Sequence, residues 1–207
     1  MLRLCTAYFP PLDYFAAIAN EERFAIDPRE HYLKQTFRNR SLIVTSQGAM
    51  SLSVPCIKTL GNHTPVAKMA IDNAKHWQRD HWRSICTAYN KSPFFLYYKD
   101  DIAVFFERHY QNLCELNFQI TDTLLKKLKL PVQRIPWMQT TDETDSYAPP
   151  VNFSPKEAPK FNFPPYLQTF PCNAPAGHLS ILDLLFNTGP EAASILQNAQ
   201  PLTTGGL

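Results

Sequence analysis

The chain has 207 residues, of which 44% are hydrophobic and 18% charged, and its net charge at pH 7 is +2. This composition is typical of a globular protein with enough apolar material for a core. The small net charge gives no reason to expect a nucleic acid partner, because such proteins usually carry a concentrated basic face. The sequence shows neither a signal peptide nor an apolar segment of the roughly 20 residues that a bilayer span needs, so a cytoplasmic location is expected.

The five cysteines are scattered, odd in number and never spaced as CxxC. This pattern predicts free thiols, several of them buried as small apolar residues, rather than a disulfide framework or a structural zinc site. The sequence also lacks the motifs of the common hydrolases, kinases, dehydrogenases and zinc proteases. We therefore expect neither a metal nor a cofactor.

The first 27 residues predict a βαβ unit. Residues 2–7 have the pattern of a short strand, Pro10 and Pro11 suit a helix start, and residues 12–20 have helical spacing. Residues 24–27 then have the pattern of a second strand. Because a strand–helix–strand unit normally joins parallel strands by a right-handed crossover, we expect an α/β fold.

Two further strands are expected at residues 41–45 and 50–54, joined by a hairpin turn at residues 46–48. The second of these strands alternates apolar and polar residues, as a half-buried strand does. An antiparallel hairpin that follows a parallel βαβ unit predicts a mixed β-sheet flanked by helices.

Helical patterns occupy much of the remaining chain. Within residues 65–89, apolar side chains recur every three or four positions and share one face, which includes His81. Residues 101–130 show the same spacing. Near the C-terminus, Ser180 is a suitable N-cap for a helix that ends near Gly189, and a final short helix follows.

Residues 131–175 hold ten of the 18 prolines and therefore cannot form a helix or a central strand. We expect this segment to wrap the surface, since disordered tracts are poor in aromatic residues. The aromatic anchors would be Phe153, Phe161, Phe163, Tyr166 and Phe170. The expected organisation is an α/β core over residues 1–130, this extended segment, and C-terminal helices over residues 176–207, all packed as a single domain.

Residues 31–40 contain the first candidate ligand site. Arginine binds phosphate or carboxylate through paired donors, and amide side chains can recognise sugar hydroxyls. A nucleotide-sugar or another anionic small molecule would suit the candidate ligand-binding residues Lys34, Gln35, Arg38, Asn39 and Arg40. The competing interpretation is a solvated polar segment held by local ion pairs.

His81 lies four positions from Trp77 and from Ile85, which places it on the inward face of the predicted helix. An inward histidine can act as a general acid or base, or can be hydrogen-bonded in the core without a role in catalysis. His76 is five positions from His81, whereas two metal-binding histidines on a helix need a spacing of four, so a metal site is not expected here. The candidate catalytic residues are His81 and His31.

Tyr89 and Asp183 are the remaining candidates. Tyr89 follows the same helix face and either turns its hydroxyl into a cleft as a ligand-binding group or only marks a helix end stopped by Pro93. Asp183 follows Ser180 by three residues, which favours a structural role in a capping box and an interaction with the helix dipole over a role in catalysis.

A set of motifs runs in order along nearly the whole chain. They are Tyr8-Phe-Pro-Pro-Leu-Asp-Tyr-Phe15, Lys34-Gln-Thr-Phe-Arg-Asn-Arg40, Leu52-Ser-Val-Pro55, His81-Trp-Arg-Ser-Ile85, Ala88-Tyr89, Ser92-Pro-Phe-Phe95, Tyr166-Leu-Gln168, and Leu179-Ser-Ile-Leu-Asp-Leu-Leu-Phe-Asn187 with Gly189. Together these motifs resemble the WbqC-like family, and its shorter form, as in Bacteroidetes-type bacteria, looks closest.

The resemblance implies a bacterial cytoplasmic protein linked to the biosynthesis of surface polysaccharides such as O-antigen, without fixing a reaction. The chain departs from longer members of the family between Pro131 and Tyr166, where it is short and rich in proline. It also has Thr6-Ala7-Tyr8 where longer members often have His-Gln-Pro, so a histidine role at that position is not carried over.

Two functions are compatible with the sequence. The first is a transferase that modifies a nucleotide-linked or lipid-linked sugar by acyl or aminoacyl-type transfer, with His81 as the base. In it, Lys34, Arg38 and Arg40 would hold the diphosphate. The alternative is a non-catalytic binding module or partner protein for cell-envelope polysaccharide enzymes, with residues 147–171 as its contact surface.

Overall fold

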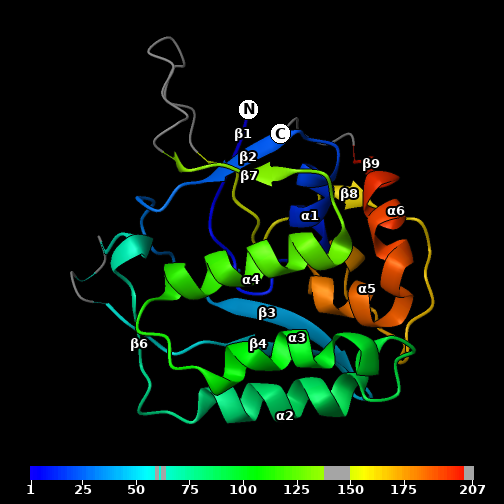
Figure 1. Cartoon of the computed structure of the whole chain (residues 1–207), viewed down its shortest axis with the longest axis horizontal. Coiled ribbons are helices and arrows are strands. Elements are labelled where there is room, and N and C mark those ends of the chain that lie inside the picture. The colour runs from blue at the N-terminus through cyan, green and yellow to red at the C-terminus, as the bar shows by residue number, and fades with distance from the viewer. Residues whose placement is uncertain (59–60, 62–63, 138–149, 203–207) are drawn as a thin grey trace.

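The computed structural model of the chain describes residues 1–58, 61, 64–137 and 150–202 (Figure 1). It confirms a mixed α/β fold, in which helices surround several small sheets. Across the described ranges, no helix has the length and the apolar character that crossing a membrane would require.

The predicted βαβ unit is present. Strand β1 (Leu2–Leu4) pairs in parallel with β2 (Arg23–Ile26), and helix α1 (Leu12–Ala19) connects them. Strand β7 (Gln133–Arg134) adds to the other edge of β2, also in parallel, so the order is β1-β2-β7. All eight residues of α1 are buried, since this helix lies between the sheet and the C-terminal helices (Figure 1).

The predicted hairpin is also present, formed by β3 (Arg40–Thr45) and β4 (Gly48–Ser53). Gly48 has φ +99°, a conformation that glycine adopts without steric cost, and this permits the tight turn. The hairpin forms a sheet of its own instead of joining the parallel strands. Other groups cover the outer edge of β3, because the Ser180 N–H donates to the Leu42 carbonyl at 2.7 Å and the Val44 N–H donates to the Tyr89 hydroxyl at 3.0 Å.

The two central helical patterns give three helices. Helix α2 (Trp77–Tyr89) begins later than residue 65, because the preceding chain forms a 3-10 turn at Val66–Lys68 and strand β6 (Ala70–Ile71), which pairs with β5 (Cys56–Ile57). Residues 101–130 divide between α3 (Phe95–Glu107) and α4 (Leu113–Leu128). The break is set by Asn112, whose side chain caps α4 by accepting hydrogen bonds from two of its first N–H groups.

The C-terminal helices are α5 (Ile181–Thr188) and α6 (Ala192–Gln197), with 3-10 turns at Ala176–His178 and Gly189–Glu191. Ser180 is the N-cap of α5, as predicted, and its hydroxyl accepts from the Leu182 N–H at 3.3 Å. Gly189 ends the helix with φ +56°, and a Cβ there would lie 2.5 Å from the Phe94 ring. No other residue would fit this close approach without displacing Phe94.

Two parts of the proline-rich segment are described: residues 131–137, which contain β7, and residues 150–175, which pack along the outside of the core. Phe153 and Phe161 are buried, and Phe161–Asn162 forms strand β8, which pairs with β9 (Gln200–Pro201). The remaining expected anchors are partly buried against the core: Phe163, Tyr166 and Phe170. Residues 138–149, which also belong to the expected wrapping segment, lie outside the described residues.

Asp183 has a structural role, but not in a capping box, because the Ser180 N–H that such a box would use is bonded to Leu42. The Asp183 carboxylate instead accepts hydrogen bonds from the Tyr166 hydroxyl at 2.7 Å and from the Gln168 amide at 2.6 Å. Burial raises the pKa of Asp183, and these donors oppose that rise. The carboxylate thus fastens the proline-rich segment to α5.

Candidate functional site

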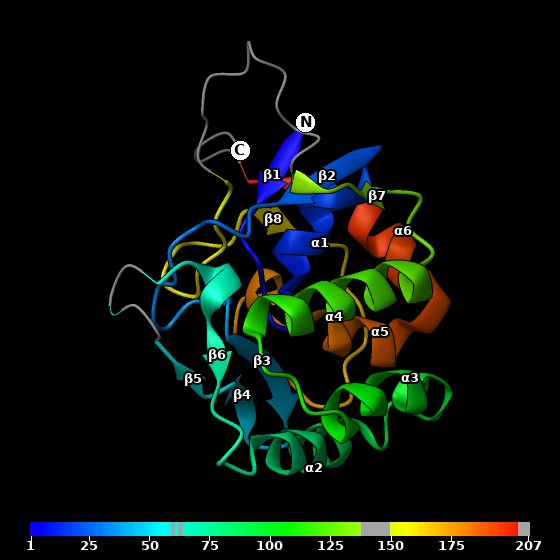
Figure 2. The same cartoon turned by 60° about the vertical axis from the view of Figure 1, so that its left-hand side comes forward.

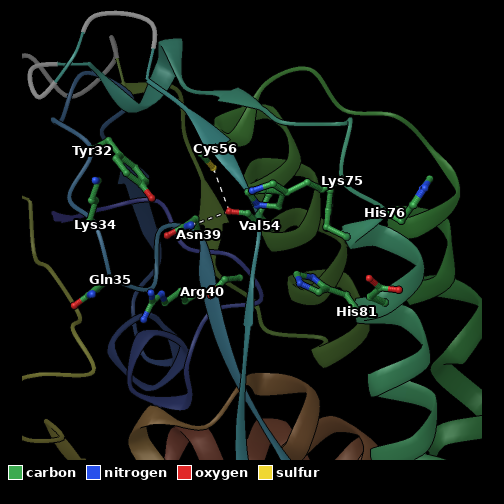
Figure 3. A pocket seen from close by; sticks show the side chains of 14 residues that line it. Tyr32, Lys34, Gln35, Asn39, Arg40, Val54, Cys56, Lys75, His76 and His81 are labelled. Carbon is green, nitrogen blue, oxygen red and sulfur yellow. Dashed lines mark hydrogen bonds between the residues drawn. The ribbon is translucent and has the colours of Figure 1, made fainter.

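A cavity of about 580 Å³ opens at the end of the β3–β4 hairpin that is remote from its turn (Figure 3). This volume lies in the range of small-molecule sites. The lining residues come from three separate stretches of chain and are Tyr32, Lys34, Gln35, Asn39, Arg40, Ser53, Val54, Pro55, Cys56, Lys75, His76, Trp77, Asp80 and His81. Figure 2 shows β4, β5 and the beginning of α2 gathered on the same side of the molecule.

The first wall of the cavity comes from residues 32–40 and is cationic (Figure 3). Lys34 and Arg40 both line it, and neither forms an ion pair with any carboxylate of the described residues. The Tyr32 ring lies on the same side, and burial raises the pKa of its hydroxyl to about 12. This wall therefore presents two uncommitted positive charges and a neutral hydroxyl.

Gln35 occupies the rim of this wall in a strained backbone conformation. Its φ of +61° lies in the left-handed region, where a residue with a Cβ is disfavoured by about 1–2 kcal/mol. Residues held in such conformations cluster at functional sites, where the surrounding structure enforces them. Gln35 lies next to Lys34, and both side chains line the cavity.

Asn39 lies at the base of the cavity, between the two walls. Its amide Nδ2 donates to the Val54 carbonyl at 2.8 Å, which fixes the orientation of the side chain. Its Oδ1 finds no donor among the described residues, although the side chain is only 8% exposed. Because this oxygen is itself buried, a ligand in the cavity does not reach it unless the Asn39 side chain moves.

The second wall is the beginning of α2 together with the residue before its cap. His76 is the N-cap residue and makes no side-chain capping bond, so the first N–H groups of the helix keep their partial positive charge. Lys75 lies 3.9 Å from Asp72, and Asp80 lies 3.3 Å from Arg79. The second wall thus adds positive potential, together with one carboxylate that already has a partner.

His81 projects from α2 toward the cavity and is only 7% exposed (Figure 3). Its Nδ1 lies 3.0 Å from the Tyr8 hydroxyl. Burial lowers the pKa of His81 to about 4, and a hydrogen bond with the Ser53 backbone opposes this effect. The imidazole is therefore neutral at pH 7.

Arg38, one of the expected ligand-binding residues, does not line the cavity. It is 4% exposed, and its Nε donates to Glu30 Oε2 at 3.1 Å. Its Nη1 donates to Thr36 at 3.2 Å and to Asn152 at 3.0 Å. The guanidinium is thus engaged inside the protein.

Tyr89 and His31 also lie outside the lining of the cavity. Tyr89 is buried against Phe186, and its hydroxyl accepts the Val44 N–H. His31 is exposed and forms an isolated β-bridge with Pro65. Of the expected site residues, the cavity brings together Lys34, Gln35, Asn39, Arg40 and His81, and it leaves out His31, Arg38 and Tyr89.

Several lining residues were not chosen as catalytic or ligand-binding residues from the sequence: Tyr32, Ser53, Cys56, Lys75, His76, Trp77 and Asp80. The five-residue spacing of His76 and His81 indicated that they lie on different sides of one helix. The helix begins only at Trp77, however, so His76 is its N-cap residue and lies beside the cavity.

Cys56 is a thiol whose pKa is raised to about 12 by burial, so it is not a thiolate at neutral pH. Within the described ranges, no cluster of three or more His, Cys, Asp or Glu residues is arranged to hold a metal ion.

The family model described as the WbqC-like protein family matches residues 6–148. The chain belongs to the WbqC-like protein family. The matched region contains every residue that lines the cavity, so both walls of this site lie in the part of the WbqC-like protein that the family shares.

One curated relative of this WbqC-like protein is the uncharacterized protein Rv1507c of Mycobacterium tuberculosis, which is 31% identical over 123 residues. The aligned region is 58% of this chain and 52% of the relative, so the chain matches about half of that protein's length. No solved structure matches the chain significantly.

Proposed function

We propose that this WbqC-like protein binds a nucleotide-linked or lipid-linked sugar in the cavity and acts as a transferase in bacterial surface-polysaccharide biosynthesis. The reaction would be an acyl or aminoacyl-type transfer to the sugar. Membership of the WbqC-like family supports the polysaccharide context, and the charge of the cavity supports the ligand class.

The observation that carries the proposal is that Lys34 and Arg40 form no ion pair with the carboxylates of the described residues. Both line one wall of the cavity, and neither has a carboxylate partner among the described residues. Arg40 is partly buried and Lys34 is exposed. The Arg40 guanidinium offers paired donors to a phosphate, and Lys34 adds a second positive charge to the same wall. A sugar diphosphate supplies such an anion.

The uncharged groups of the cavity suit the sugar. The Tyr32 hydroxyl and the Gln35 amide are polar groups on the cationic wall. Sugar hydroxyls both donate and accept hydrogen bonds, so they can satisfy both groups. The volume of about 580 Å³ is sufficient for a sugar and part of its phosphate carrier.

The cationic walls would also assist the transfer itself. When a sugar amine or hydroxyl attacks the carbonyl of an activated acyl donor, negative charge develops on the carbonyl oxygen. Collapse of this adduct breaks the bond to the donor's leaving group, which departs with the proton that the sugar amine or hydroxyl loses. Fixed donors and positive potential in a site shielded from water stabilise that charge, and this is usually the largest contribution to such catalysis. Arg40 and the uncapped beginning of α2 lie on opposite walls and supply this potential from both sides.

Thermal unfolding with uridine and thymidine diphosphate sugars tests the proposal. At a ligand concentration about a hundredfold above Kd, binding adds about 2.7 kcal/mol, which raises the Tm of a chain of this size by several degrees. Arg40→Gln should abolish the shift. Arg83→Gln is the matched control, because Arg83 is exposed on α2 outside the cavity, and it should keep the shift. A Tm that no such sugar changes would refute the proposal.

The alternative, a binding module that uses residues 147–171, has less support. Within the described part of that range, Phe153 and Phe161 are buried and so cannot meet a partner, whereas Leu167 is 91% exposed. Leu167→Ser should therefore remove the partners of such a module in a pull-down. An unchanged set of partners would argue against it.

A further inference from the structure

Tyr8 and His81 meet at the inner end of the cavity. Tyr8 is fully buried, and its hydroxyl has one hydrogen-bond partner among the described residues, His81 Nδ1 at 3.0 Å. The Tyr8 and Trp77 rings both lie close to the imidazole, with ring centroids 5.8 and 5.3 Å from it. The imidazole is therefore held between Tyr8 and Trp77 and cannot turn freely.

The direction of the Tyr8–His81 hydrogen bond follows from burial. A phenol O–H that found no acceptor in this interior would cost about 1–3 kcal/mol, and Nδ1 is the acceptor within reach. Tyr8 therefore donates its proton to Nδ1, which must itself be free of a proton. In a neutral imidazole the remaining proton then resides on Nε2.

The Nε2 edge of the ring faces the opposite way from Tyr8. That edge lies toward the cavity and toward the Ser53 backbone, whose carbonyl accepts from it, so a ligand oxygen would share the Nε2–H with this carbonyl in a three-centre hydrogen bond. Ser53 is the register partner of Arg40 across the β3–β4 hairpin. A ligand oxygen at this end of the hairpin would thus lie between the Arg40 guanidinium and the His81 N–H.

We propose that His81 serves the ligand as a neutral hydrogen-bond donor through Nε2–H, and that Tyr8 is the positioning residue that fixes this tautomer. The group it recognises is an acceptor oxygen, either a phosphoryl oxygen or the carbonyl oxygen of an acyl group. The ligand half of this inference rests on the proposed function, whereas the tautomer is a property of the protein without ligand. A base role for His81 would need the opposite arrangement, with Nδ1 protonated and a lone pair on Nε2.

The tautomer can be measured directly by long-range ¹⁵N–¹H NMR of the uniformly ¹⁵N-labelled full chain at pH 7. The expected spectrum of His81 has a pyrrole-like Nε2 and a pyridine-like Nδ1. In Tyr8→Phe the donor is lost, so the His81 signals should shift toward a mixture of the two tautomers. A pyrrole-like Nδ1 in the wild type, or an imidazolium, would overturn the inference.

Two substitutions at His81 distinguish the contributions of the two ring nitrogens to ligand binding. The side-chain amide nitrogen of glutamine lies close to the position of imidazole Nε2, whereas that of asparagine lies close to Nδ1. Calorimetry with a uridine diphosphate sugar should show His81→Gln within about threefold of the wild-type Kd, and His81→Asn weaker by about tenfold, the effect of one lost hydrogen bond. The reverse order would contradict the donor role.

The two proposals fail in different ways. If the wild-type chain binds neither uridine diphosphate nor its sugars, the proposed function is refuted, and the NMR spectrum without ligand still decides the tautomer. If His81→Asn does not fold, which circular dichroism would show, the wild-type and Tyr8→Phe spectra remain decisive. If the His81 signals of Tyr8→Phe were identical to those of the wild type, Tyr8 would not be the residue that fixes the tautomer.

Discussion

Arg38 and Arg40 are separated by one residue, yet the structure gives their guanidinium groups opposite environments. Arg38 is turned inward, where Glu30 accepts two of its N–H groups. Arg40 is turned to the cavity, where no carboxylate of the described residues meets it. In a regular strand, residues two apart point to the same side, so Arg38 and Arg40 would share a face and Asn39 would lie opposite. The segment departs from this alternation because β3 begins only at Arg40, and Asn39 lines the cavity together with Arg40.

This difference predicts opposite consequences of removing each charge. Arg38→Met leaves the Glu30 carboxylate buried without its partner, which should reduce the free energy of unfolding by about 3–5 kcal/mol. Arg40→Gln removes a charge without a partner and should change it by less than about 0.5 kcal/mol. Urea denaturation measures both. Equal losses in the two variants would show that the environments are not as described.

The link between the proline-rich segment and α5 gives a second prediction. The Tyr166 hydroxyl and the Gln168 amide donate to the same oxygen of Asp183, and Asp183→Asn removes the negative charge from that acceptor. The loss of charge-assisted bonds in a buried site should cost about 3 kcal/mol and should expose the segment to limited proteolysis. Tyr166→Phe, which removes one of the two donors, should cost about half as much. A wild-type cleavage pattern in Asp183→Asn would refute this attachment.

The depressed pKa of His81 gives a prediction for pH. Its folded-state value of about 4 lies below the value of 6.5 for an exposed histidine, so the unfolded chain binds more protons between these limits. The contribution of His81 to stability is therefore complete above pH 6.5, falls with decreasing pH, and is lost as pH falls through 4. The loss is about 3 kcal/mol relative to His81→Gln, which cannot titrate.

Measurement of both chains from pH 7 to pH 4 tests this prediction by subtraction. Burial raises the pKa of Asp13 to about 6, so that carboxyl contributes the opposite slope between about pH 4 and pH 6. Asp13 is present in both chains, and its contribution cancels in the difference. A difference that stays constant with pH would show that His81 is not desolvated.

Substitution of Gln35 should change the free energy of unfolding and the ligand affinity in opposite directions. Gln35→Gly relieves the left-handed backbone strain at φ +61° and should stabilise the fold by about 1 kcal/mol. The same change removes an amide from the cavity and should weaken binding of a uridine diphosphate sugar by about threefold or more. Lys129→Gly is the matched control, because Lys129 has φ +54° at the end of α4, away from the cavity, and should gain stability with unchanged affinity.

Local patterns in the sequence were sufficient for much of the fold. Short-range spacing and turn residues predict the βαβ unit, the β3–β4 hairpin, the inward face of α2 and the Ser180 cap, because each depends on residues within one or two turns of one another. The break between α3 and α4 was not evident, because apolar residues continue on both sides of it. The separate sheets were also not evident, since the edge of β3 is covered by groups from Tyr89 and Ser180, which are distant in the chain.

The site depended far more on tertiary structure. Its chemical character, a cationic and amide-rich segment at residues 34–40 and an inward histidine at position 81, follows from residue types and helical spacing. Which arginine is free could not be read from the sequence, because the answer depends on Glu30 and Asn152 lying beside Arg38 in the folded chain. The proton position on His81 depends likewise on Tyr8, 73 residues away. Ionisation and hydrogen-bond direction are set by burial and by the nearest partners, and both arise only when distant segments pack together.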